Sequence, residues 1–288
     1  MRSAPLLFVL SLVVPFAGCD KIEAPDNPKP GPCDGGGNGY GFRRVLIEDM
    51  TGFTCPNCPQ AAEIARDLQN LYCGDVVVIA EHVNAAFAEP TSNVPGDPFS
   101  TDFRTEAGNT YESQFGIASL PSGLINRTSI NGVYPLSRGQ WAQHVSDLIG
   151  APSEFEVVID TAAFNGGTST YDFSVHVPVL QSVNGEYDLT VLLIEDSVIE
   201  GQVDSRFDPP ALYPYTHRHV LRTAVTAPLG DQLIAFSANA GQTITPPSFH
   251  LTLPPNVLEP AHCTLVAFVS RAGDYEILQV SELHLIPD

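Results

Sequence analysis

The stretch Arg44–Leu68, RVLIEDMTGFTCPNCPQAAEIARDL, decides the fold. It predicts a short buried strand around Leu46, then a turn, then a helix that starts at the motif Cys55-Pro56-Asn57-Cys58. The helix is indicated by apolar residues that recur three and four positions apart on one face: Ala61, Ile64, Ala65 and Leu68. Prolines in this motif are compatible with a helix start, because amides in the first turn have no helical acceptor.

The spacing of Cys55 and Cys58 suits a small disulfide ring at a helix start. The helix dipole and the free amides there favour a thiolate, which makes Cys55 the predicted nucleophile. This role requires that solvent reach the two sulfurs, and we expect them to be presented to it. Two other interpretations stay open. The pair can be a purely structural disulfide, or it can be half of a zinc site, for which Cys33 and Cys73 are the candidate further ligands.

Composition limits the classes of function. The chain has 288 residues, enough for one large or two ordinary domains, and a hydrophobic content of 43% allows substantial cores. The 13 basic residues against 33 acidic ones give a net charge of −20, which argues against a basic face that binds nucleic acid.

The N-terminus predicts export. Residues 1–18 combine a positive start with a short apolar run, as in a signal peptide, and the run is too short to span a membrane. Phe16-Ala17-Gly18-Cys19 resembles a bacterial lipobox, which implies cleavage before Cys19 and its lipidation; a plain secretory signal is the alternative. Residues 19–42 are rich in Pro and Gly and predict a flexible tether.

Residues 43–150 predict an α/β unit. Asp75–Ala80 (DVVVIA) is a buried-type strand, so two strands flank the first helix and are expected to be parallel. Residues 84–110 resemble an inserted loop, and Phe99–Phe115 includes a helix. Asn131-Gly132 predicts a tight hairpin turn, and Ser137–Ile149 an amphipathic helix.

This order of elements resembles the thioredoxin fold. The resemblance implies that Cys55 attacks, that Cys58 resolves the mixed disulfide, and that Asp49 is the buried acid that shuttles the proton. It also implies that Pro121 is a cis-proline, which with Leu120 holds an extended substrate strand. The sequence departs from the family in Phe53-Thr54 before the first cysteine, in the inner Pro-Asn pair and in the long insertion.

Asp49 has a rival in Glu48. Neighbours on a strand point to opposite faces, so only one of these two acids can lie beneath the sulfurs. The spacing to Cys55 favours Asp49, and the alternative is an ordinary acid at the end of a strand.

Residues 152–288 predict an all-β, immunoglobulin-like sandwich. Seven runs rich in Val, Ile, Thr and aromatic residues are separated by Gly, Pro and Asn turns, with no helical period. Arg206–Tyr215 (RFDPPALYPY) is interpreted either as a rigid connection between strands or as a partner-binding loop. His217 and His219 share one face if extended, which permits metal binding, but no third ligand is evident, and packing against the first domain is the alternative.

Three more cysteines need an assignment. Cys33 and Cys73 each precede a strand of the parallel pair and can meet at one sheet edge, so we expect a Cys33–Cys73 disulfide that ties the tether to the domain. Cys263, in an apolar run, is expected to be a buried free thiol.

The lipobox, EDMTGFTCPNCP and the β-rich second half together resemble the Omp-twenty-eight-related outer-membrane lipoproteins. That resemblance implies a lipid-anchored protein of the bacterial envelope, at the outer membrane. Two functions stay open: a thiol–disulfide oxidoreductase acting on protein thiols without a cofactor or metal, or a surface binding lipoprotein for an envelope or host protein, with its cysteines locked as a disulfide in a scaffold. The sequence does not distinguish an oxidant from a reductant or an isomerase.

Overall fold

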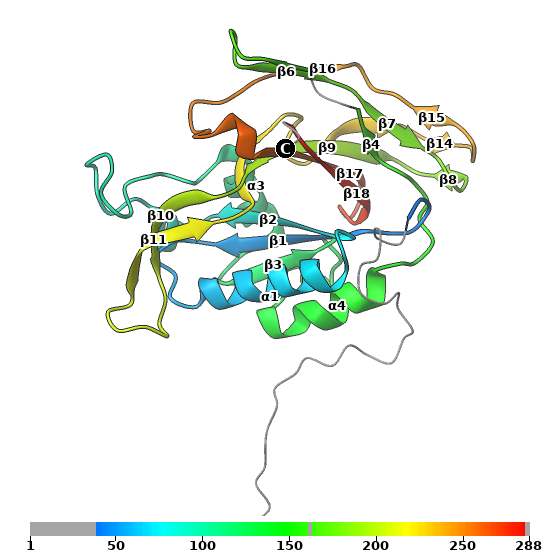
Figure 1. The fold of residues 1–288 in the computed structure, drawn as a ribbon. Coiled ribbons are helices and arrows are strands. Elements are labelled where there is room, and N and C mark those ends of the chain that lie inside the picture. Colours follow the sequence, from blue (N-terminus) through cyan, green and yellow to red (C-terminus); the bar gives the residue numbers. More distant parts are fainter. Residues whose placement is uncertain (1–38, 161–162, 286–288) are drawn as a thin grey trace, which may run out of the picture.

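A computed structural model describes residues 39–160 and 163–285 (Figure 1). The predicted signal peptide 1–18, the lipidation site Cys19, Cys33 and most of the tether 19–42 lie outside the described residues. Among the described residues, no helix is long and apolar enough to cross a membrane.

The first part of the chain is mixed α/β. Strands β1 (Val45–Thr51) and β2 (Val76–His82) are parallel, as predicted, and helix α1 (Cys58–Leu71) connects them. Strand β3 (Ser122–Ile125) pairs antiparallel with the other side of β1. The remaining elements of this part are α2 (Ala85–Ala88), α3 (Glu106–Phe115), the 3-10 turn η1 (Arg138–Gln140) and α4 (Trp141–Leu148).

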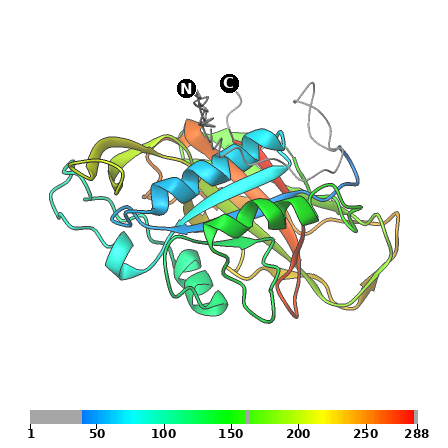
Figure 2. The same cartoon turned by 90° about the horizontal axis from the view of Figure 1, so that it is seen from below.

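The helices cover both faces of this sheet. Helices α1 and α4 lie on one face (Figures 1 and 2), over a core that includes Val45, Ile47 and Trp141. Helix α3 lies on the opposite face, where Tyr111 and Phe115 pack against Leu46 and its neighbours. The predicted apolar stripe of α1 is confirmed, because Ala61, Ala65 and Leu68 are buried.

The second part is built of strands, joined by one 3-10 turn, η2 (Pro260–His262). The strands are β4 (Val158–Ile159), β5 (Ala163–Asn165), β6 (Thr170–Phe173), β7 (Val175–Pro178), β8 (Val183–Asn184), β9 (Tyr187–Glu195), β10 (Val198–Val203), β11 (Ala211–His217), β12 (Val220–Ala224), β13 (Asp231–Ile234), β14 (Ser237–Ala238), β15 (Thr243–Ile244), β16 (Phe249–Thr252), β17 (Cys263–Arg271) and β18 (Ile277–His284).

One sheet runs through both parts of the chain. Its order is β18-β17-β9-β12-β2-β1-β3, and β13 also pairs with β9. The junction is the contact of β12 with β2, where Ala80 N donates to His219 O at 2.8 Å and Val220 is the register partner of Ala80. Strands from the second half therefore extend the sheet that carries the CxxC helix.

Strands β9 and β17 contribute side chains to two cores, one on each face of the sheet. On one face, Val191 and Leu265 pack against a second layer formed by strands such as β6 and β7. On the other face, Leu192 and Phe268 pack with α3 in the core of the first part. Each of these two strands therefore belongs to both cores, since successive residues point to opposite sides.

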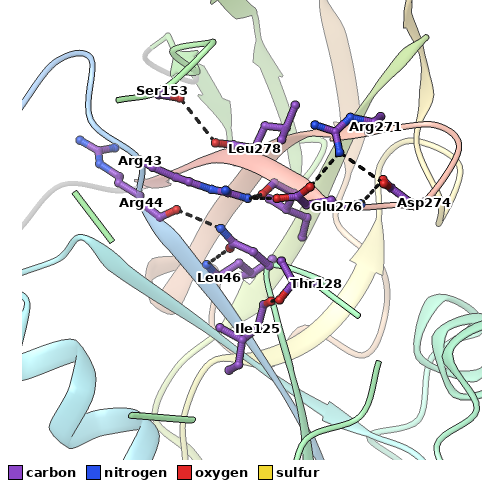
Figure 3. Close-up of polar contacts among 12 residues, drawn as sticks. Arg43, Arg44, Leu46, Ile125, Thr128, Ser153, Arg271, Asp274, Glu276 and Leu278 are labelled. Atoms are coloured by element: carbon purple, nitrogen blue, oxygen red, sulfur yellow. Dashed lines mark hydrogen bonds and ion pairs between the residues drawn. The ribbon is translucent and has the colours of Figure 1, made fainter. Parts of the chain in front are cut away.

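Polar contacts near the start of β1 also connect the two parts of the chain. Arg43 donates to Glu276 at 2.8 Å, and Glu276 also accepts from Arg271 at 2.8 Å (Figure 3). The last tether residues, Gly41 and Phe42, pair with the backbone at 152–153. The described end of the predicted tether is thus fixed to the β-rich part, although its composition favours a flexible segment.

Candidate functional site: a covered disulfide

The CxxC motif lies between the end of β1 and the start of α1. Cys55 and Cys58 are joined as a disulfide, with their Cα atoms 5.5 Å apart. Helix α1 begins at Cys58, so Cys55 precedes the helix instead of opening it. Cys55 is held in a turn, where its amide donates to Gly52 O at 3.0 Å and its carbonyl accepts from Cys58 N at 3.3 Å.

Gly52 is required at its position for a steric reason. A Cβ at this position would lie 2.6 Å from the carbonyl oxygen of Phe87. Phe87 O also accepts from Thr54 N at 3.0 Å. The close approach of the α2 segment to this turn therefore requires the missing side chain of Gly52.

Solvent does not reach the disulfide, contrary to the expectation that the sulfurs are presented to it. Cys55 and Cys58 are each only 1% exposed. The reason is non-local, because the cover comes from residues about 150 positions later in the chain. We call Val198–His217, which comprises β10, β11 and their connecting loop, the cover hairpin (Figure 1).

Backbone hydrogen bonds hold the cover hairpin on the CxxC segment. Val203 N donates to Phe53 O at 2.7 Å, and Ser205 N donates to Pro56 O at 3.0 Å. The side chain of Gln202 adds a bond from Nε2 to Cys55 O at 3.2 Å. The hairpin thus satisfies the backbone acceptors that flank the disulfide, as an added strand would.

An ion pair links the loop of the cover hairpin to α1. Arg206 donates to both carboxylate oxygens of Glu63, at 2.7 and 2.8 Å, and also to Asp204. The bond from Arg206 lowers the pKa of Glu63. Two-point guanidinium–carboxylate pairs have a defined geometry, so this contact fixes the loop against the helix.

The insertion at residues 84–110 also contributes to the enclosure. Glu200 of β10 accepts from the amides of Phe99 and Thr101, at 2.8 and 3.1 Å. Phe99 and Phe103 pack on Phe53, which precedes Cys55 by two residues. The insertion, predicted to be a loop, joins the CxxC segment to the cover hairpin in the fold.

A cavity of about 290 Å³ lies beside the disulfide, between α1 and the cover hairpin. Both Asp49 and Cys58 line it. Asp49 is 2% exposed, and its Oδ1 atom has no hydrogen-bond partner in the described part of the chain. Burial without a compensating charge raises the pKa of Asp49 to about 8.

Glu48 lies on the other face of β1, as strand alternation requires. It forms a buried ion pair with Arg127, whose Nη2 lies 2.6 Å from Oε1, and both side chains are fully buried. Arg127 also lies over the rings of Tyr111, Phe115 and Phe268. The acid that shares the cavity with Cys58 is therefore Asp49, and Glu48 has a structural partner.

Three histidines line the same cavity, His82, His217 and His219. His82 of β2 and His217 of β11 contact each other with ring centroids 5.5 Å apart. Burial lowers the pKa of His217 to about 4 and the pKa of His82 well below its usual value. His217 therefore packs against the first part of the chain, and no cluster of metal-binding side chains occurs among the residues described.

The Leu120–Pro121 peptide bond is cis. The next residue, Ser122, is the register partner of Met50. Pro121 thus lies beside the carboxyl end of β1, the end from which the CxxC segment departs. The resemblance to thioredoxins places its cis-proline in the same position of the chain.

Cys263 is separate from this site. Cys263 is a buried free thiol, as expected, and burial raises its pKa to about 12. The predicted Cys33–Cys73 disulfide includes a residue outside the described ranges, so it stays a prediction.

Sequence reasoning missed the cover hairpin. Residues 206–215 were interpreted as a connection or a partner-binding loop, whereas β11 begins at Ala211 and pairs with β10. A usable signal was the pair of short runs VIEGQV and ALYPYTH on either side of a polar, Pro-containing segment. The role of Arg127 was also missed, because it lies in a polar-looking stretch, Asn126–Ser129.

A family model described as outer membrane protein Omp28 matches residues 108–287, which is more than half of the chain. The chain belongs to the Omp28 family of outer membrane proteins. The matched residues include the cover hairpin, whereas the CxxC segment precedes them. Membership supports a location in the cell envelope at the outer membrane, as the sequence resemblance implied.

Comparison with solved structures also found similar chains. The Omp28-family chain is similar to HBP35 of Porphyromonas gingivalis, with 17% identity, coverage of 86% of this chain and 76% of that chain, and a TM-score of 0.62. At this identity the likeness concerns the fold alone. A domain of the outer membrane lipoprotein Omp28 from the same organism also matches, with 16% identity, coverage of 47% and 91%, and a TM-score of 0.31. No curated protein gives a significant match.

Proposed function

We propose that this Omp28-family protein carries out thiol–disulfide exchange on envelope proteins through Cys55 and Cys58. In this proposal residues 43–150 form a thioredoxin-like unit, and residues 152–288 form an immunoglobulin-like sandwich that supplies the cover and docking surfaces. Cys19 carries the lipid that holds the protein at the membrane.

The observation that carries this proposal is the buried carboxyl of Asp49 in the same cavity as Cys58. A structural disulfide has no use for such a group, and burying a carboxyl with an unpartnered oxygen costs free energy. Ionisable groups with strongly shifted pKa values gather at functional sites, because proton transfer near neutral pH requires them.

The chemistry follows from these positions. A partner thiolate attacks Sγ of Cys55, the Cys55–Cys58 bond breaks, and its electron pair leaves with Sγ of Cys58. Asp49, with a pKa of about 8, is mostly protonated at pH 7 and supplies the proton to that sulfur. A second partner thiolate then attacks the mixed disulfide, which leaves the partner oxidised and both Cys55 and Cys58 reduced. In the reverse direction Asp49 accepts the proton from Cys58.

This exchange requires that a partner thiolate reach the sulfurs. Because both sulfurs are covered, exchange requires the loop of the cover hairpin to lift from residues 53–56. The bonds to be broken are two from backbone amides, one from Gln202, one from Ser205 Oγ to Asn57 Oδ1, and the pair of Arg206 with Glu63. Leu120 and Pro121 would then hold the partner strand beside the exposed Cys55.

The burial of both sulfurs also supports a second candidate, an envelope binding protein in which the disulfide only locks the scaffold. The two candidates differ in the response of the folded protein to mild reductants. A locked disulfide resists them, whereas an exchange centre equilibrates with them.

The test is equilibration of the full chain with glutathione buffers at pH 7, followed by acid quenching, alkylation and mass spectrometry. We expect a defined reduction potential, and we expect Cys55 to be alkylated before Cys58. The Cys55→Ser/Cys58→Ser variant gives the background from the remaining cysteines. If the pair stays oxidised in excess dithiothreitol while the protein is folded, the scaffold function replaces exchange.

The lipid anchor is tested separately, by metabolic labelling with an alkyne fatty acid. The wild-type chain should be labelled in the outer-membrane fraction, and Cys19→Ser should not. Labelling of both chains would place the lipid elsewhere.

A further inference from the structure

The cover hairpin crosses the CxxC segment as a short extended strand. The amides of Val203 and Ser205 donate, at 2.7 and 3.0 Å, to backbone carbonyls on either side of Cys55. The amide of Asp204, between them, donates instead to Pro210 O within the hairpin, at 2.8 Å. Extended segments pair with a neighbouring backbone through alternate amides of this kind. The bonds to the CxxC segment therefore use main-chain donors, which every residue except proline offers.

One side-chain contact adds a charge to this pattern. Arg206 bonds to Asp204 at 2.6 Å, so these two side chains lie on the same side of the segment. Arg206 also donates to both carboxylate oxygens of Glu63, which lies in the second turn of α1. When the loop of the cover hairpin lifts, the CxxC side keeps its backbone acceptors, and the carboxylate of Glu63 loses the guanidinium that it holds.

Glu63 is the ionised acid at this site. Among the residues that line the disulfide cavity, the acids are Asp49 and Glu63. Asp49 is buried and mostly protonated at pH 7, whereas the side chain of Glu63 is 42% exposed. Arg66 of the same helix forms its ion pair with Asp67, at 3.9 Å. The cation bound to Glu63 is thus Arg206, and an open site offers this carboxylate to a cation from a partner.

We propose that Glu63 is a specificity-determining residue, which selects partner segments that carry an arginine two residues after the reacting cysteine. The inference rests on the proposed thiol–disulfide exchange and names its substrate class. The partner segment occupies the place of the lifted loop: its cysteine takes the position of Asp204, between the two backbone bonds, and its arginine takes the position of Arg206. Leu120 and Pro121 hold the same segment without selecting its charge, because neither side chain is charged.

The chemical steps stay those of the exchange. The partner thiolate forms a bond to Sγ of Cys55 while the Cys55–Cys58 bond breaks, and Cys58 takes a proton from Asp49. A thiolate of a second partner molecule then attacks the mixed disulfide, releases Cys55 as a thiolate and leaves the two partners joined by a disulfide. Two partner thiols are oxidised for each disulfide that is reduced. Glu63 transfers no proton or electron in these steps and acts on the encounter that precedes them.

Arginine is preferred over lysine for a geometric reason. The contact of Arg206 with Glu63 joins two guanidinium nitrogens to two carboxylate oxygens, at 2.7 and 2.8 Å. An ammonium group has the same charge but cannot form this parallel pair. The net charge of −20 attracts both cations alike, so a preference for arginine over lysine separates Glu63 from the general field of the protein.

The test uses three peptides with blocked ends, based on Gly201–Phe207 (GQVDSRF) with Asp204→Cys. One keeps the arginine (GQVCSRF), and the others carry lysine or glutamine in its place. Each peptide, in large excess at pH 7, reduces the full chain, and acid quenching, alkylation and mass spectrometry follow the Cys55–Cys58 disulfide. Rates are divided by those of the same peptides with dithiodipyridine, an uncharged disulfide, which removes differences in thiol reactivity.

We expect the arginine peptide to react about fivefold faster than the glutamine peptide, as for a partly exposed ion pair, and about twofold or more faster than the lysine peptide. Glu63→Gln should bring the ratio of the arginine to the glutamine peptide close to one. Arg206→Ala breaks the same ion pair but leaves the carboxylate free, so it should speed every peptide and keep the ratio. A looser cover raises all rates together, so the ratio reports selection alone.

Asp147→Asn is the charge control. It removes one exposed carboxylate from α4, on the same face of the sheet as α1, and should keep the ratio. Equal rates for arginine and lysine, a ratio that survives Glu63→Gln, or one that is lost in Arg206→Ala or Asp147→Asn would each overturn the selection and leave exchange intact. If no peptide reduces the folded chain, even with Arg206→Ala, the exchange function fails and this inference falls with it.

Discussion

Arg206 and Glu63 form a two-point ion pair between the cover hairpin and helix α1, with Nη1 2.7 Å from Oε2 and Nη2 2.8 Å from Oε1. Both side chains are partly exposed, at 39% and 42%. The pair is therefore accessible to solvent, whereas the disulfide that it helps to cover is not. Arg206 also bonds Asp204 of the same loop, so its removal loosens both the loop and the contact of the loop with α1.

Arg206→Ala should speed reduction of the Cys55–Cys58 disulfide. A partly exposed pair contributes about 1 kcal/mol, so the open form should rise roughly fivefold, and the rate of reduction by dithiothreitol at pH 7 with it. The matched control is Arg271→Ala, which removes ion pairs of similar exposure far from the CxxC segment. Equal rates for the wild type and Arg206→Ala would show that this pair does not limit access.

Asp49→Asn should have opposite effects on stability and on redox rate. The pKa of Asp49 is raised on folding from 3.8 to about 8, so the folded state holds the proton more tightly, and stability falls as pH rises between these values. Asparagine does not ionise, so the variant should be more stable than the wild type at pH 8, by on the order of 3–5 kcal/mol.

The redox effect of Asp49→Asn is measured in parallel. Reduction of the disulfide and resolution of the mixed disulfide at pH 7 should both slow by tenfold or more, because Cys58 loses its proton partner. Urea unfolding at pH 5 and pH 8 gives the stability difference, and stopped-flow reduction gives the rate. A variant with wild-type kinetics would remove Asp49 from the mechanism and leave only its effect on stability.

The parts of the fold that follow from local sequence were predictable. The Asn131-Gly132 turn is present, with both residues at positive φ and the bond from Ile130 N to Val133 O at 2.8 Å. The face of α1 and the parallel pair β1–β2 follow from periodicity and from a short connection. In each case the determinants lie within a few tens of residues of one another.

The cover of the site was not predictable, because it depends on contacts between distant segments. Nothing in the composition of residues 198–217 indicates that Val203 and Ser205 bond to residues 53 and 56. The alternation of apolar and polar residues in β9 and β17 likewise predicted a sandwich. It did not predict that the opposite faces of these strands pack with α3 in the core of the first part. Sequence reasoning thus found the cysteine pair and the acid that shares its cavity, but it predicted that solvent reaches the sulfurs, which are buried.

Acid should weaken the contact between the cover hairpin and β2. His217 is buried, with its pKa lowered from 6.5 to about 4, so the unfolded state binds more protons below pH 6.5. The contribution of His217 to stability is complete above pH 6.5 and is lost as pH falls towards 4, by ~3 kcal/mol. His82 shifts in the same direction.

Urea unfolding at pH 7 and pH 4.5 tests this dependence. His217→Gln should reduce the loss of stability at pH 4.5 relative to pH 7. His250→Gln is the control, because the side chain of His250 is 64% exposed. If His217→Gln and the wild type lose the same free energy between the two pH values, another group controls the acid response.

Arg127→Met should destabilise the protein by ~3–5 kcal/mol. It leaves the carboxylate of Glu48 buried without its partner, and Glu81, whose pKa is already raised by burial and by Glu48, lies nearby. The Glu48→Gln/Arg127→Met double variant should recover part of the loss, measured by urea unfolding.

Arg104→Met is the control. It breaks a more exposed pair with Asp102 and should cost less than ~1 kcal/mol. A double variant no more stable than Arg127→Met would mean that packing of the guanidinium against its three rings outweighs its charge.

Gly123→Ala should disrupt the junction of β3 with α4, next to Pro121. An added Cβ would lie 2.4 Å from Trp141 Cε2, and the Trp141 ring is fully buried, with Nε1 donating to Leu136 O at 3.2 Å. The ring cannot move without breaking that bond and displacing its neighbours in the core, so the expected loss is ~3 kcal/mol, at the upper end of overpacking effects. Gly139→Ala in η1 is the matched control, since nothing lies within 4 Å of its added Cβ and the change should be within ~0.5 kcal/mol. Because Gly123 is the register partner of Asp49, a displaced β3 should also slow reduction of the disulfide in Gly123→Ala and leave Gly139→Ala unaffected. A Gly123→Ala protein as stable as Gly139→Ala would mean that Trp141 does not pack on β3 as described.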